Sequence, residues 1–233
     1  MSKSMTSVVK FLESDLELKF KDIGKYLDFF DKSIESEQET ASKRASRHDD
    51  KMIQSIMRYQ SHISFPAIHS TALLIFMHSS FEHLFCWSAC WFAFPEDGGS
   101  HIPSLTGYKE SEEFIRRVLG VKPFESSEWK SVNALRQLRN YIAHGGSENI
   151  MGVKQTSRYL HAARKINREY GEAFDIKESC GTFAIKPKQS SPRIAMACYR
   201  SFLLLLIRLA KEIEKTPKAA VSAASRRRKS VTS

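Results

Sequence analysis

Three side chains that could act on a phosphate group lie close together in the sequence: Arg139, Asn140 and His144. An arginine presents a planar, permanently charged fork of donors that suits phosphate oxygens. A histidine has an ordinary pKa of about 6.5 and can give or take a proton near neutral pH. When the 2′-hydroxyl of RNA attacks the neighbouring phosphate, a catalyst must move protons and stabilise the charge on the phosphate. The segment could therefore cleave RNA without a metal.

The spacing of these residues suits a single helix. Asn140 and His144 are four residues apart and share a helical face. Arg139 lies about 140° round the helix from His144, and the two would converge if the helix loosens at Gly145 and Gly146. A plainer interpretation stays open, because cations in a last turn followed by glycine also end ordinary helices and complement their dipoles.

The helix that must carry this segment is predicted to begin at Ser126 or Ser127, which can cap it, and to end at the two glycines. Its apolar side chains recur at helical spacing, which predicts a buried face: Trp129, Val132, Leu135, Leu138 and Ile142. The motif would then sit at the end of a helix anchored in the core.

The remaining elements are predicted to be mostly helical. Apolar spacing and Gly or Pro breaks indicate helices over residues 5–35, 49–59, 67–92, 111–119, 155–174 and 193–215. A polar break is expected at residues 36–47, and Met52, Ile56 and Met57 are expected to point inward. Short strands at residues 176–179 and 182–186 flank Cys180-Gly181 and predict a hairpin. The expected fold is all-α, with a small β-hairpin before the last helix.

Charge and composition support a nucleic-acid ligand only weakly. The net charge is +10, but six Lys and Arg residues lie in residues 215–233, which have no acidic residue, so residues 1–214 carry only +4.

We expect an N-terminal helical extension (residues 1–62), a helical domain (65–215) and a disordered basic tail (216–233). Histidines and Glu82 interrupt the apolar run at residues 68–94, which favours a buried helix over a membrane span. With only four cysteines, the chain is expected to be cytoplasmic.

Two further groups of residues have more than one interpretation. A basic stripe could line an RNA groove or form a solvated helix face; it comprises Arg158, Arg164, Lys165 and Arg168, with His161 among them. His83, Cys86 and Cys90 share a helix face but lack a fourth local ligand, so buried packing is favoured over structural zinc. No metal site and no cofactor are expected.

Residues 138–145 resemble the signature of the HEPN superfamily, the higher eukaryote and prokaryote nucleotide-binding domains. That signature is an arginine, four to six residues and then a histidine, often with an asparagine after the arginine; Arg139, Asn140 and His144 match its four-residue form. Phe81 and Glu82 resemble a phenylalanine–glutamate pair of several branches. The hairpin followed by an apolar helix is similar to a ribonuclease-type branch. The likeness covers about residues 65–215, whereas residues 1–62 match no known pattern.

The resemblance implies a HEPN-like helical bundle that dimerises and acts as a metal-independent endoribonuclease, leaving 2′,3′-cyclic phosphate and 5′-hydroxyl ends. His144 would be the general acid or base, Arg139 would hold the phosphate, and Asn140 would orient one of them. Glu82 is a weaker candidate for positioning Arg139 or His144. Such proteins serve as toxins or anti-phage effectors, so RNA, a second copy and an antitoxin or defence partner are the implied partners. The alternative is an inactive HEPN binding module that partners a nucleotidyltransferase or defence protein.

Overall fold

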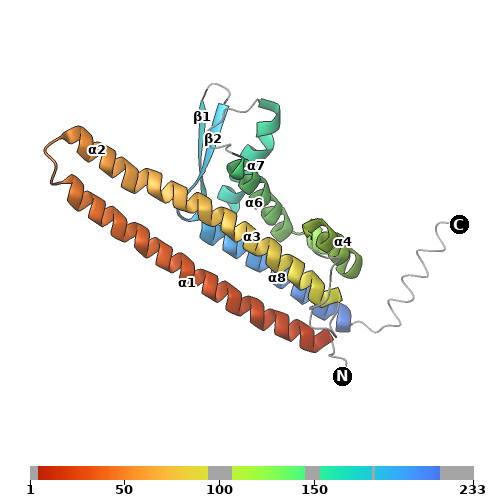
Figure 1. Cartoon of the computed structure of the whole chain (residues 1–233). Helices are drawn as coiled ribbons and strands as arrows, with labels where there is room; N and C mark the ends of the chain where they lie inside the picture. Colours follow the sequence, from red (N-terminus) through yellow and green to blue (C-terminus); the bar gives the residue numbers. More distant parts are fainter. Residues whose placement is uncertain (1–4, 94–106, 145–152, 180–181, 216–233) are drawn as a thin grey trace. The chain divides into compact units, whose positions relative to one another are not determined.

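The computed structural model describes residues 5–93, 107–144, 153–179 and 182–215 (Figure 1). The all-α fold with one small hairpin before the last helix is confirmed. In chain order the elements are α1 (Met5–Ala45), α2 (Lys51–Tyr59), the π-helix η1 (Gln60–Ser64), α3 (Phe65–Ala93), α4 (Tyr108–Leu119), α5 (Lys122–Glu125), α6 (Ser127–Ala143), α7 (Val153–Tyr170), β1 (Phe174–Ser179), β2 (Thr182–Pro187) and α8 (Ser191–Lys215).

The first helix is longer than its sequence predicts. The expected polar break at residues 36–47 is wrong for most of its length, because α1 continues to Ala45. Residues 36–45 contain no glycine or proline, and Lys43 Nζ pairs with Glu39 Oε1 at 2.6 Å one helical turn away. Polar residues of good helix propensity thus extend an exposed helix beyond its apolar stripe.

Helix α2 also corrects a prediction. Asp50 caps it by accepting a hydrogen bond from the Met52 backbone N–H at 2.7 Å. None of its residues is buried. Met52 and Ile56 are exposed, so their expected inward direction is wrong, whereas Met57 is half-buried. Amphipathic spacing identifies an apolar face but does not say what covers it.

The chain stays helical from α2 through η1 into α3, although separate helices were expected over residues 49–59 and 67–92. Pro66 has no backbone N–H to donate to the carbonyl four residues earlier, and its ring crowds that carbonyl. The wider turn of η1 immediately before it gives the ring room, so one helical run continues through the proline.

The chain divides into two compact units, and α1, α3 and α8 contribute residues to both. One unit combines Met1–Glu17, His83–Ser126 and Ser201–Ser233, and the other combines Leu18–Glu82 with Ser127–Arg200. The expected domains at residues 1–62 and 65–215 stay a prediction. The expected tail, residues 216–233, lies outside the described residues.

Aromatic packing holds the first unit together. The Phe85 ring lies 5.1 Å from Tyr108 and 6.2 Å from Phe202, measured between ring centroids. Phe124 of α5 contacts Phe202 at 6.1 Å, and the Arg116 guanidinium lies 4.0 Å above the Phe124 ring. These contacts join α3, α4, α5 and α8 within that unit.

The second unit contains α6, the helix that carries the Arg-Asn-x-x-x-His segment. Its predicted apolar face is confirmed as buried: Trp129, Val132, Leu135, Leu138 and Ile142 are all core residues. Helix α6 packs on α7, where Ser131 Oγ donates to Glu169 Oε2 at 2.9 Å. The motif therefore begins on a rigid, well-anchored helix.

The hairpin lies beside α7 (Figure 1), and Asn167 joins the two. Strands β1 and β2 pair antiparallel, with Ile176 opposite Ile185. Asn167 Oδ1 accepts from the backbone N–H groups of Ala173 and Phe174 at 3.0 and 2.9 Å, and its Nδ2 donates to the Phe174 carbonyl at 2.8 Å. One side chain thus satisfies three backbone groups at the start of β1.

Replacing Asn167 with alanine should lower the free energy of unfolding by about 2–3 kcal/mol, since partly buried backbone groups lose their partners. Urea denaturation followed by circular dichroism measures this. Asn167→Asp, which keeps the acceptor but not the donor, should cost less. An alanine variant as stable as the wild type would show that water replaces these bonds without penalty.

Candidate functional site

Arg139 and Asn140 are joined by a direct hydrogen bond near the end of α6. Arg139 Nη1 donates to Asn140 Oδ1 at 2.9 Å, and both side chains are half-buried. Because Oδ1 faces the arginine, the Asn140 amide NH₂ is left to donate elsewhere. Arg139 Nε is buried and has no hydrogen-bond partner. The donor of this pair that their mutual hydrogen bond leaves unused is therefore the Asn140 NH₂, and the binding of a phosphate by the pair stays a prediction.

His144 lies at the open end of the same helix. Its backbone N–H donates to the Asn140 carbonyl at 3.1 Å, so regular helical geometry extends to His144. Its ring is exposed, and in the part of the chain that the structure describes no hydrogen bond or ion pair reaches it. Gly145 and Gly146, where the helix was expected to loosen, lie outside the described residues. The structure thus joins Arg139 to Asn140, while His144 faces solvent beside them.

A buried histidine stands behind this motif on α3. The His78 side chain is fully buried, and its Nδ1 lies 2.9 Å from the Tyr199 hydroxyl of α8. Its Nε2 lies 3.3 Å from Glu82 Oε1, but the angle does not make a hydrogen bond and Nε2 has no partner. Phe81 stacks on Tyr199 with ring centroids 4.5 Å apart. Glu82, predicted to position Arg139 or His144, thus lies next to His78.

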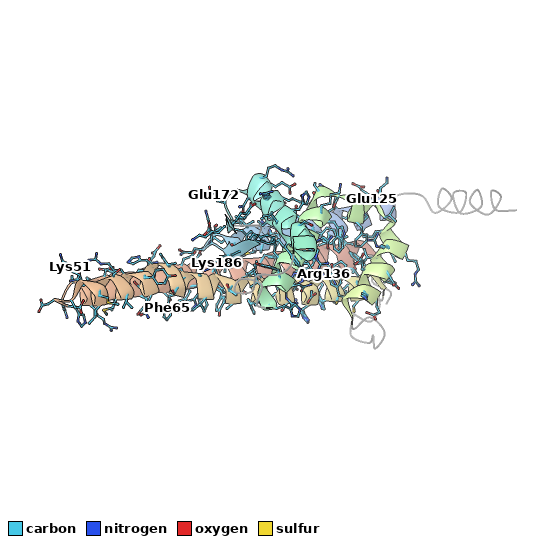
Figure 2. The ribbon with its side chains drawn as sticks, turned by 90° about the horizontal axis from the view of Figure 1, so that it is seen from above. Lys51, Phe65, Glu125, Arg136, Glu172 and Lys186 are labelled. Atoms are coloured by element: carbon cyan, nitrogen blue, oxygen red, sulfur yellow. The ribbon has the colours of Figure 1, made fainter. Side chains whose placement is uncertain are left out.

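Burial and, after it, the positive charges of Arg139 and then Arg136 together lower the pKa of His78 to about 4. His78 is therefore neutral at physiological pH. The buried Nε of Arg139 agrees with this, since it places part of the guanidinium in the protein interior. Figure 2 labels Arg136, one turn before Arg139 on α6. The motif arginine thus has a cationic neighbour on α6 and a neutral imidazole within the core.

Sequence reasoning missed His78, Arg136 and Tyr199. Two signals were present: His78 lies four residues before Glu82, and Arg136 lies three before Arg139, so each pair shares a helical face. Tyr199 had no such signal, because it is 121 residues from His78 in the chain. Only the packing of α3 with α8 within the second unit brings those two rings together.

The basic stripe of α7 is partly neutralised. Arg164 Nη2 pairs with Glu178 Oε1 of β1 at 2.5 Å, and Lys165 pairs with Glu169 of its own helix. Arg158 lies over the Tyr159 ring, 4.6 Å from its centroid. Arg168 is exposed. Of the residues predicted to bind RNA, Arg158 and Arg168 are therefore the two that no acidic side chain holds within the described residues.

No cluster of three or more potential metal ligands occurs among the described residues. Cys86 and Cys90 are half-buried and Cys198 is buried, no disulfide joins these three cysteines to one another, and Cys180 lies outside the described residues. Burial raises the pKa of the Cys198 thiol to about 11, so it stays protonated.

None of the helices described is long and apolar enough to cross a membrane.

Comparison of the chain with protein-family models, with curated proteins and with solved structures finds no match.

Proposed function

We propose that this protein is a metal-independent endoribonuclease that acts through Arg139 and His144. The observation that carries the proposal is the arrangement at the end of α6. A half-buried guanidinium is held by Asn140, and an exposed imidazole follows one turn after Asn140. This arrangement supports the proposal because an arginine, which suits phosphate, and an imidazole, which can transfer a proton, lie on one short stretch of helix.

Each residue then has a separate task in the reaction. Arg139 holds a phosphate oxygen and stabilises the charge that develops on it, and the free NH₂ of Asn140 supports the same oxygen. His144 moves a proton between the 2′-hydroxyl, the leaving 5′ oxygen and solvent, for which its exposure suits it. One imidazole cannot accept the proton of the 2′-hydroxyl and donate a proton to the leaving 5′ oxygen at the same time. A second copy of the motif therefore supplies the other proton transfer. The products are a 2′,3′-cyclic phosphate and a 5′-hydroxyl.

Arg158 and Arg168 supply the adjoining contacts to the RNA backbone, since acidic side chains already hold Arg164 and Lys165. A nuclease that cuts host or phage RNA must be restrained, so we place the protein among toxins or defence effectors with an antitoxin or similar partner.

The experiment that tests this function is incubation of purified protein with total RNA in EDTA. We expect the wild type to cut and the Arg139→Ala/His144→Ala double variant to leave the RNA intact. His48→Ala, which removes an exposed histidine near the end of α1, is the matched control and should cut like the wild type.

A second candidate function, a catalytically inactive binding module, is favoured by one observation. Large apolar side chains are exposed along α2, η1 and the start of α3, where a partner such as a nucleotidyltransferase or defence protein could dock. This alternative predicts RNA or protein binding with no cleavage by the wild type at high enzyme concentration.

A further inference from the structure

Three aromatic rings meet within the second unit, where the end of α6 lies against α7 and the hairpin. The Tyr141 ring of α6 lies 5.1 Å from that of Tyr159 on α7, measured between centroids. It also stacks on the Phe183 ring of β2, with centroids 6.2 Å apart. Tyr141 is buried, whereas Tyr159 and Phe183 are half-buried and reach the surface. We call Tyr141, Tyr159 and Phe183 the aromatic cluster.

The aromatic cluster adjoins His144 on the side away from Arg139. Regular helical geometry extends to His144, and each residue turns the helix by about 100°. His144 therefore lies between Asn140, about 40° away, and Tyr141, about 60° away. Arg139 and Asn140 thus flank the imidazole on one side, and Tyr141 flanks it on the other with the two rings that pack on it.

The hairpin carries Phe183 to the surface at the start of β2. Alternate residues of a strand share a face, and on this face Ile185 and Pro187 are buried whereas Phe183 is not. The residue opposite Phe183 on β1 is Glu178, whose carboxylate pairs with Arg164 Nη2 at 2.5 Å. The acidic neighbour of Phe183 is therefore neutralised, so it does not set a bare negative charge beside the cluster.

A guanidinium lies directly on this cluster. Arg158 is exposed, its guanidinium carbon lies 4.6 Å from the centroid of the Tyr159 ring, and its Nη2 donates to the Tyr159 hydroxyl. An uncharged ring holds the arginine without cancelling its charge. Bases stack on aromatic rings and on guanidinium planes alike, and arginine also binds the phosphates between them. Flat apolar rings beside a positive charge match a nucleotide, which joins a flat base to an anion.

We propose that Tyr159 and Phe183 form a base-stacking subsite, in which one base of the RNA packs on these rings beside His144 and Arg158 binds a neighbouring phosphate. This inference rests on the proposed ribonuclease function, because it names what the same site holds next to the phosphate that is cut. Buried Tyr141 supports the two rings from below. Since every base has a flat face, the subsite accepts any base.

The test is the affinity of the full-length protein for RNA, measured by fluorescence anisotropy in EDTA. Every protein carries His144→Ala, so that the RNA stays intact. The probes are a fluorescein-labelled adenosine oligomer and an abasic RNA oligomer of the same length, which keeps the phosphates but has no bases. Tyr159→Leu and Phe183→Leu keep an apolar side chain and remove the ring. Each should raise the dissociation constant of the adenosine oligomer about tenfold and leave that of the abasic oligomer unchanged.

Two further variants control for the loss of a tyrosine. Tyr159→Phe keeps the ring and should bind the adenosine oligomer as tightly as the parent protein. Tyr26→Leu makes the same change as Tyr159→Leu in an exposed residue of α1, and it should also bind like the parent.

The subsite would be overturned if Tyr159→Leu and Phe183→Leu bound the adenosine oligomer as tightly as Tyr26→Leu, if they lost affinity equally for both probes, or if the parent bound neither probe. Cleavage of RNA by the protein with His144 intact is measured separately. Cleavage with unchanged affinities would remove the subsite alone. Intact RNA together with a ring-dependent affinity would remove the ribonuclease proposal and leave the base-stacking subsite.

Discussion

Replacing His144 with alanine should lower the rate of RNA cleavage by at least about 100-fold, the usual contribution of a side chain that transfers a proton in the transition state. His144 is exposed and has no polar partner among the described residues, so the variant should keep its fold and stability. Single-turnover cleavage of a labelled RNA in EDTA gives the rate, and thermal unfolding followed by circular dichroism checks the fold.

The companion variants separate proton transfer from phosphate binding. Arg139→Lys keeps the charge but loses the fork and the bond to Asn140 Oδ1, so it should retain part of the activity, whereas Arg139→Ala should lose it. His48→Ala should cleave at the wild-type rate. If His144→Ala cleaved as fast as His48→Ala, the imidazole would have no part in the reaction and the mechanism would have to be abandoned.

Lowering the pH from 7 to about 4 should remove about 3 kcal/mol of stability through His78 alone. Burial and the neighbouring arginines lower its pKa from the ordinary 6.5 to about 4 in the folded protein. Above pH 6.5 the ring is neutral in both the folded protein and the unfolded chain, so His78 does not lower the free energy of unfolding there. Below 6.5 the unfolded chain takes up a proton that the folded protein cannot, so stability falls progressively and the loss is complete below about pH 4.

Urea denaturation at several pH values measures this loss. His78→Gln should be less stable than the wild type at pH 7, because it alters the contact with Tyr199, but the gap should narrow as the pH falls. Comparing the two proteins cancels the titration of carboxyl groups that they share. His48→Ala, which removes an exposed histidine, should keep the full wild-type dependence. A constant gap between His78→Gln and the wild type would show that His78 is not held neutral.

The motif helix was predictable because its signals are local. Apolar residues at steps of three and four act within a few residues, and α6 has the buried face they indicate. The hairpin was predictable for the same reason: the two strand segments are close neighbours in the sequence, and Ser179 pairs with Thr182.

The surroundings of Arg139 could not be predicted because they depend on tertiary contacts. The neutral state of His78 results from burial and from charges on another helix, and its partner Tyr199 is distant in the chain. The prediction that the apolar side of α2 points inward failed. Amphipathic spacing shows that a helix has an apolar side, but it does not show that a core covers that side. The continuation of α1 beyond residue 35 failed because polar residues with ion pairs at i,i+4 sustain a helix without an apolar stripe.

The central claim is that Arg139 and His144 form a ribonuclease site, and mapping the ends of RNA fragments tests it most directly. Wild-type protein and the Arg139→Ala/His144→Ala variant would be incubated with total RNA in EDTA and the fragment ends identified. The proposal predicts 2′,3′-cyclic phosphate and 5′-hydroxyl ends with the wild type alone. Intact RNA with both proteins, or the same cuts with both, would contradict it.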